Sequence, residues 1–214
     1  MGASGPLKNN SAGSKRFLRE ILDFQALIGG IVFALHPAQY SIMRGALIRA
    51  ADPNLKIAEG QTIEDWTLYR EILRTWASGF TGLSVISQRE TPFHRDGRSP
   101  CNMFDVLATF GKTIDPDIRA ELPGIGIRFH YNPGTLLLVL SKTIRHGVSV
   151  SKEERWCFAF FLRERILYQL GSWEEEGWMG DELFVAWLEL EEYHKVRRLI
   201  AIERGKAWEP IGVL

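Results

Sequence analysis

The sequence predicts an α+β fold in which a core of short strands follows one helical segment and precedes another. Three observations indicate this arrangement. Apolar residues recur at three- and four-residue spacing over residues 15–80, short apolar runs separated by turn residues fill residues 81–165, and helical spacing returns within residues 166–214. Such a run of strands closes as a barrel or a two-sheet jelly roll, because these arrangements protect strand edges.

Length and composition favour one domain. The 214 residues suffice for a substantial core, so we expect a flexible Gly/Ser/Asn-rich leader over residues 1–14 and a single domain over residues 15–214. Lys and Arg number 26, as do Asp and Glu, so the total charge lacks the strongly basic footprint of many duplex-binding proteins. Two cysteines are too few for a disulfide framework and match an intracellular setting. No run of about 18 uncharged apolar residues occurs, so no membrane span is expected.

Helical spacing predicts three helices in the N-terminal layer and one near the C-terminus. Apolar residues at helical spacing over residues 17–31 predict the first helix, which should end at His36, because a residue before proline avoids the α region. Pro37 can open the second helix. A third is expected over residues 61–78, and a long C-terminal one over residues 182–204. His36 is a possible metal ligand, but a structural hydrogen bond at the helix boundary is the favoured role.

The central region alternates short apolar runs with turn signals. Strands are expected at residues 83–87, 103–111, 124–131, 135–140 and 155–162, and the fourth of them runs towards residues 144–148. Residues 112–121 are expected to form a loop, and Asn132-Pro133-Gly134 is a strong turn signal. Ile125, Ile127 and Phe129 share one face of their strand, which leaves the next residue, a histidine, on the other face.

The chemistry of the chain begins at His94-Arg95-Asp96. An imidazole and a carboxylate two residues apart on an extended segment project from the same side. A histidine from a neighbouring strand would complete a triad of two histidines and one carboxylate, which binds a ferrous ion and leaves positions open for a cosubstrate and oxygen. On its own the pattern is a weak signal, and a polar turn between strands is the alternative.

Two later residues strengthen the metal hypothesis. His146 is followed nine residues later by Arg155, which stands at the start of an expected strand. The histidine suits a third metal ligand. The planar arginine suits the far carboxylate of a keto-diacid that chelates the metal through its other end. His130 competes as the third ligand, but His146 is favoured because it alone has the downstream arginine.

Three segments resemble a known family. Residues 89–99 (RETPFHRDGRS), 131–140 (YNPGTLLLVL) and 145–149 (RHGVS) are similar to the TET/JBP family of 2-oxoglutarate- and Fe(II)-dependent nucleic-acid dioxygenases, in particular to its compact fungal branch. The resemblance implies a double-stranded β-helix, or jelly roll, with flanking helices. It implies Fe(II), 2-oxoglutarate and O2 as cofactors, and double-stranded DNA with a flipped, methylated base as substrate. A DNA substrate in turn implies a nuclear protein, which we expect to be a monomer.

The resemblance assigns the iron and cosubstrate residues by position. His94, Asp96 and His146 would bind iron, and Arg155 would bind 2-oxoglutarate. Cys157 stands where family members often have a serine that helps hold the same carboxylate, and a thiol is a weaker donor.

Four further residues are candidates for contact with the base. By resemblance, Arg89 would stack on the flipped base and Phe161 would cover its other face; a surface arginine and a core phenylalanine are the structural alternatives. Ser99 falls where some relatives carry an acidic residue that reads the cytosine edge. Asp117 lies at the end of the 111–117 loop, and its carboxylate could accept a hydrogen bond from a base amino group.

Several functions remain open at this point. Oxidation of 5-methylcytosine to 5-hydroxymethylcytosine and further products is favoured. Demethylation of N6-methyladenine, or action on both bases, would use the same iron centre. A catalytically silent relative that binds nucleic acid is a third hypothesis, and the intact triad and Arg155 argue against it. A small-molecule or protein hydroxylase is opposed by the family resemblance alone.

Overall fold

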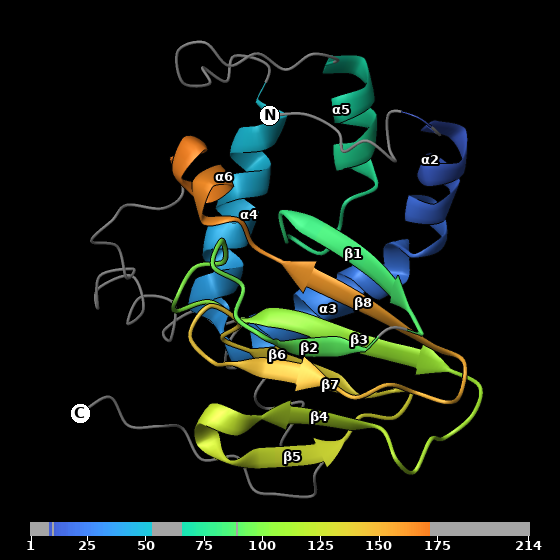
Figure 1. The fold of residues 1–214 in the computed structure, drawn as a ribbon. Helices are drawn as coiled ribbons and strands as arrows, with labels where there is room; N and C mark the ends of the chain where they lie inside the picture. The colour runs from blue at the N-terminus through green and yellow to red at the C-terminus, as the bar shows by residue number, and fades with distance from the viewer. Residues whose placement is uncertain (1–8, 10, 53–65, 89, 172–214) are drawn as a thin grey trace, which may run out of the picture.

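A helical layer covers one of two four-stranded antiparallel sheets (Figure 1). The computed structural model describes residues 9, 11–52, 66–88 and 90–171. The helices are α2 (Ser11–Glu20), α3 (Leu22–Leu35), α4 (Pro37–Ala51), α5 (Trp66–Arg74) and α6 (Glu164–Gln169). The strands are β1 (Gly82–Ser87), β2 (Thr91–His94), β3 (Asp105–Gly111), β4 (Arg119–Leu122), β5 (Ile127–His130), β6 (Leu136–Val139), β7 (His146–Val148) and β8 (Arg155–Phe161), with a 3-10 turn η1 (Pro123–Ile125).

The two sheets share one nested pairing scheme. The first sheet has the order β1-β8-β3-β6 and the second has the order β2-β7-β4-β5. The pairs β1–β8, β2–β7, β3–β6 and β4–β5 are all antiparallel. The chain from β1 to β8 therefore follows the course of one long hairpin, with its tip between β4 and β5, distributed over two sheets. The predicted mixture of a helical layer with a strand core is confirmed.

The larger core cluster lies between the helices and the first sheet. Its buried members come mainly from α3, α4, β3 and β8: Ile28, Val32, Met43, Ala46, Ala50, Phe80, Met103, Val106, Ala108, Phe160, Leu162, Leu167 and Leu170. Burial of each large apolar side chain contributes roughly 1.5–3 kcal/mol. The fully buried Gln39 of α4 accepts a hydrogen bond from the backbone N–H of Phe104 and donates one to its carbonyl, both at 2.8 Å. This pair of bonds fixes α4 against the start of β3.

A smaller cluster fills the space between the two sheets. Ile118, Ala120, Tyr131 and Val148 are its buried members, and Leu107 and Leu137 of the first sheet pack against it. This cluster holds the second sheet over the first.

The N-terminal layer departs from the prediction in its boundaries. The first expected helix is two helices, α2 and α3, separated at Ile21, and α2 already includes residues 11–14 of the expected leader. The helix expected over residues 61–78 ends at Arg74, and its first residues lie outside the described part of the chain. The helix expected over residues 182–204 also lies outside it. Among the described residues, no helix is long and apolar enough to cross a membrane.

The second sheet was predicted less well than the first. Strand β4 falls inside the expected loop 112–121, because four residues that alternate Arg119 and Glu121 with two buried apolar residues are too short to stand out from a loop. The strand expected over residues 124–131 begins only at Ile127, so Ile125 does not share its face, and the two isoleucine side chains are 53% and 48% exposed. Ile125 belongs to η1, and Ile127 lies in β5, which is an edge strand of its sheet.

Candidate metal centre

Two histidines and an aspartate meet where β2 and β7 pair. His94 ends β2 and His146 begins β7, and the two residues are direct partners in the antiparallel register. Asp96 follows β2 after one intervening residue. A Cβ atom on Gly147 would lie 2.7 Å from the ring of Phe93 and 3.0 Å from the backbone carbonyl oxygen of Thr91. The glycine after His146 thus permits the pairing that brings the two imidazoles together.

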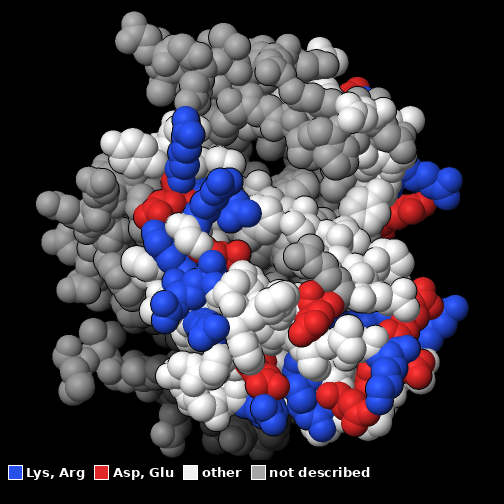
Figure 2. All heavy atoms as spheres, viewed as in Figure 1, with Lys and Arg blue, Asp and Glu red and all other residues white. Residues whose placement is uncertain are grey.

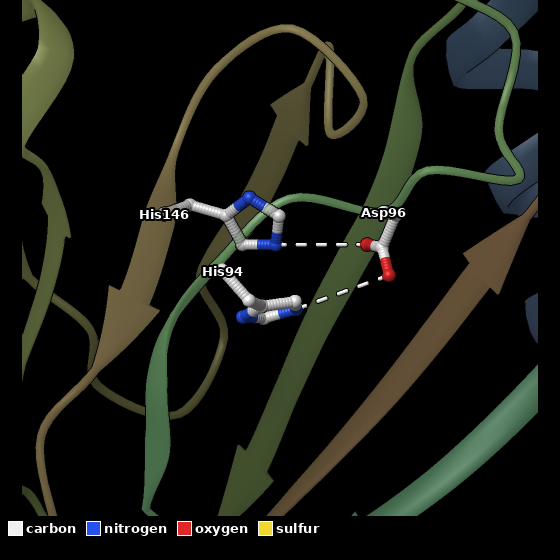
Figure 3. Close-up of side chains that lie close together, drawn as sticks. All are labelled: His94, Asp96 and His146. Carbon is white, nitrogen blue, oxygen red and sulfur yellow. Dashed lines mark ion pairs between the residues drawn. The ribbon is translucent and has the colours of Figure 1, made fainter.

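The three side chains point toward one another (Figure 3). His94 Nε2 lies 3.9 Å from Asp96 Oδ1, and His146 Nε2 lies 3.7 Å from Asp96 Oδ2. All three ligand atoms lie within 4.8 Å of one another. These separations are too long for hydrogen bonds, and they leave space for an ion about 2 Å from each ligand atom.

In both histidines, the hydrogen bond of Nδ1 determines the protonation of Nε2. His94 Nδ1 lies 2.8 Å from the carbonyl oxygen of Pro92, and His146 Nδ1 lies 3.0 Å from that of Ile144. A carbonyl oxygen only accepts, so each Nδ1 carries the proton and donates it. In the neutral rings, both Nε2 lone pairs are therefore free to bind a metal, which is the arrangement common among metal-binding histidines.

A buried carboxylate holds the segment that carries Asp96. The Asp96 N–H donates to the carbonyl of Ser141 at 2.9 Å, and the Ser99 N–H donates to the carbonyl of Asp96 at 3.0 Å. Both serine hydroxyls donate to Asp105 Oδ2, the Ser99 bond at 2.8 Å, and the N–H of Leu162 donates to Asp105 Oδ1 at 3.1 Å. Burial raises the pKa of Asp105, and these three bonds oppose that shift.

The triad opens into a cavity of about 160 Å³. Arg155, at the start of β8, lines the same cavity and is itself buried. Its guanidinium carbon lies 5.5 Å from the centre of the Tyr131 ring. A buried arginine beside such a triad can bind one anionic end of a molecule whose other end binds the metal ion in the same cavity.

Cys157 and Phe161 also line this cavity. The Cys157 sulfur lies 3.6 Å from the Tyr131 hydroxyl, and burial raises the pKa of both groups, so both are neutral near pH 7. The Phe161 ring lies opposite Gly82 of β1, where a Cβ atom would collide with it, and the Arg163 guanidinium carbon is 4.0 Å from its centre. Phe161 is half-buried and presents an aromatic surface to the cavity.

Two predicted base contacts are not brought to the cavity, and a third lies outside the described residues. Ser99 is fully buried, its hydroxyl is bound to Asp105, and it does not line the cavity. Asp117 is exposed and forms an ion pair of 3.0 Å with Lys152, away from the cavity lining. Arg89 lies outside the described residues.

The two competing histidines have other partners. The ring nitrogen Nδ1 of His130 lies 2.9 Å from the Arg119 guanidinium on the exposed surface of β5. His36 Nδ1 accepts the backbone N–H of Gln39 at 3.0 Å and so caps α4, which confirms the predicted boundary role.

Sequence reasoning missed Tyr131 and Asp105 as parts of the site. Tyr131 is fully buried, and its ring and hydroxyl contact Arg155 and Cys157. Asp105 stands within an otherwise apolar strand segment, and a single carboxylate in such a run was the one available signal.

A family model matches most of the chain. The model of the family described as Tet_JBP, oxygenase domain of the 2OGFeDO superfamily, matches residues 5–164. No curated protein matches the chain. The matched range contains the eight strands of the described part of the chain, the triad and the other cavity-lining residues named above.

Proposed function

The chain belongs to the Tet_JBP family of oxygenase domains within the 2OGFeDO superfamily, and from this premise we propose that it oxidises the methyl group of 5-methylcytosine flipped out of double-stranded DNA. The superfamily uses Fe(II), 2-oxoglutarate and O2, so the chain is a dioxygenase of that class. The observation that carries the proposal is the triad of His94, Asp96 and His146, which shares one cavity with the buried Arg155.

The residues present fit the expected cofactors. Two imidazole nitrogens and one carboxylate form the donor set of non-haem Fe(II) oxygenases. The two Nδ1–H groups are bound to carbonyls, which orients the donors for an ion. Arg155 is a buried cation in the cavity wall and fits the far carboxylate of 2-oxoglutarate. When bound, iron and 2-oxoglutarate together activate oxygen for hydroxylation of a C–H bond.

The chain's own residues bind, orient and exclude water. Tyr131 supports the guanidinium of Arg155 from one side and so limits its freedom before 2-oxoglutarate binds. Leu107 and Val148 form apolar walls of the cavity and restrict access of water to the metal centre. The half-buried ring of Phe161 offers a stacking surface for a flipped base, which offsets part of the few kcal/mol that flipping costs.

We further propose that the two sheets are the two halves of a double-stranded β-helix. The nested antiparallel pairs β1–β8, β2–β7, β3–β6 and β4–β5 support this proposal, as does the alternation of successive strands between the two sheets on either side of the β4–β5 hairpin. A jelly roll is obtained when one long hairpin is wound in this way. On the same premise, we propose a nuclear monomer that acts on double-stranded DNA.

N6-methyladenine is a second candidate substrate. Residue 99 is a serine, and its hydroxyl is bound to Asp105 inside the protein. Position 99 therefore offers no carboxylate for the amino group of cytosine. A pocket without that contact fits either methylated base, since both bring a methyl group on the edge of a flat ring.

The experiment is direct. The protein is incubated with Fe(II), 2-oxoglutarate and duplexes that carry 5-methylcytosine or N6-methyladenine, and the nucleosides are then identified by mass spectrometry. We expect 5-hydroxymethylcytosine, and its loss in H146A but not in H130A, whose histidine lies outside the cavity. Loss of the methyl group from adenine alone would transfer the proposal to the second substrate. No change in either base would refute both.

A further inference from the structure

Five arginines lie on the segments that carry or adjoin the metal centre. This arginine cluster consists of Arg95, Arg98, Arg145, Arg163 and Arg165. Arg95 lies between two members of the triad, Arg145 directly precedes the third, and Arg163 lines the cavity. Figure 2 shows Lys and Arg side chains gathered on one part of this face, over α6 and the neighbouring loops of Figure 1.

Contacts join the three chain segments that carry the cluster. The carbonyl of Arg98 accepts the N–H of Glu164 at 3.1 Å, which joins the loop after β2 to the start of α6. Lys142 pairs with the Glu164 carboxylate at 2.6 Å, which joins the loop before β7 to the same helix. The guanidinium carbon of Arg145 lies 5.4 Å from the centre of the Phe93 ring, next to the triad.

The cluster carries uncompensated positive charge. Within the described part of the chain, none of its five arginines forms an ion pair, whereas other cations such as Lys15, Arg128 and Lys152 are paired with carboxylates. Four of the five are exposed, and Glu164, which lies among them, is already paired with Lys142. A protein of zero net charge therefore concentrates positive charge beside its metal centre.

We propose that the arginine cluster binds the phosphodiester backbone of duplex DNA beside the flipped base. Guanidinium groups match phosphate oxygens in a bidentate manner, and such contacts position a protein on the duplex without reading its sequence. Arg145 and Arg163 rest on aromatic rings, so they lose less freedom when they bind. This inference rests on the proposed function, because a DNA substrate brings both the phosphates and the target base to the same place.

The test compares two double variants of equal charge. R95Q/R145Q removes two arginines of the cluster, and R16Q/R19Q removes two from α2 as the control. Binding of an unmethylated fluorescent duplex is measured by anisotropy over a range of salt concentrations. Each lost phosphate contact lowers the slope of log K against log salt by about 0.9. We expect the cluster variant to lose about two in slope and, near 0.1 M salt, on the order of tenfold in affinity per arginine, while the control binds as wild type.

Two additional variants separate charge from folding and metal binding. R98Q/R165Q alters residues that do not adjoin a triad member in sequence, and we expect the same change in slope. R95K/R145K retains the charges and should retain the slope with a lower affinity, because lysine cannot form the bidentate contact. Thermal unfolding and Fe(II) binding identify any variant whose loss arises from damage to the fold or the metal centre.

The outcomes distinguish this inference from the proposed function. If wild type oxidises methylated DNA while both cluster variants bind duplex with the wild-type slope, the arginine cluster is not the backbone site. If wild type oxidises neither base but the cluster variants lose duplex binding, the proposed function fails and the cluster stands. Loss of binding to anionic vesicles or acidic peptides, with DNA binding unchanged, would also overturn the inference.

Discussion

Replacement of Asp105 by alanine is expected to weaken both the fold and the metal centre. Its carboxylate accepts hydrogen bonds from Ser99, Ser141 and the backbone of Leu162, and all three of these residues are buried. The same two serines also hold the backbone of Asp96, which donates its N–H to the carbonyl of Ser141 and accepts the N–H of Ser99 at its carbonyl. The variant D105A therefore leaves three buried donors without their acceptor and frees the segment that carries a metal ligand.

The magnitude follows from those three donors. A buried donor that loses its acceptor costs about 1–3 kcal/mol. Removal of a carboxylate whose pKa is raised by burial returns part of that cost, and the serine hydroxyls can rotate. We therefore expect D105A to lower the free energy of unfolding by about 3–5 kcal/mol. D105N retains one acceptor oxygen, and its amide can donate to the serine hydroxyl oxygens, so a loss of about 1–2 kcal/mol is expected.

Urea unfolding and Fe(II) titration measure the two effects. Loss of an outer partner of a metal site typically lowers metal affinity about 10- to 100-fold, and we expect D105N, which remains folded, to show such a loss. The exposed Asp117, paired with Lys152, provides the control, and D117A should match wild type in both assays. A D105A variant that loses less than about 1 kcal/mol would refute the hydrogen-bond argument, and wild-type iron affinity in D105N would refute the link to Asp96.

Three further predictions concern the cavity and its surroundings. R155A should raise the KM for 2-oxoglutarate by about thirtyfold or more, because loss of a buried charged partner costs at least about 2 kcal/mol; steady-state kinetics with an unchanged KM would contradict the assignment. Iodoacetamide should modify the exposed Cys101 in the folded protein and Cys157 after unfolding, since burial raises the pKa of the latter; equal rates by mass spectrometry would contradict this. Several hydrogen bonds, the largest from the backbone N–H of Asp117, lower the pKa of Asp115 from 3.8. The ionised Asp115 carboxylate therefore stabilises the fold above pH 3.8, and this contribution is lost as the pH falls through the lower pKa of the folded state. The urea midpoint of D115N should therefore be lower than that of wild type at neutral pH, and the two should converge in acid.

The metal ligands were predictable because their signal is local. His94 and Asp96 are two residues apart on an extended segment, and the spacing from His146 to Arg155 places a ligand and a cation on successive strands. The direct pairing of His94 with His146 across β2 and β7 is a tertiary property that no local spacing specifies. The sequence therefore indicated which residues form the triad, but it did not indicate that His94 and His146 are paired across two strands.

The surroundings of the ligands could not be predicted in the same way. The bonds of Asp105 reach Ser99, Ser141 and Leu162, which come from three separate parts of the chain. Ser99 was assigned to the base edge from its position in the family, and such a position does not show which way a hydroxyl points. The contact of Tyr131 with Arg155 likewise depends on how the two sheets lie against each other.

The nested strand pairs also imply an order of assembly. Residues that pair in β4 and β5 are close in sequence, those of β3 and β6 are farther apart, and His94 and His146 are farther still. Each inner pair shortens the loop that the next pair must close, so growth outward from the tip spreads the entropic cost of closure. We expect the two histidines to meet late, after the inner pairs have formed. An iron ion held by His94, Asp96 and His146 would stabilise the β2–β7 register by mass action, so Fe(II) affinity would report how fully the outer strands have closed.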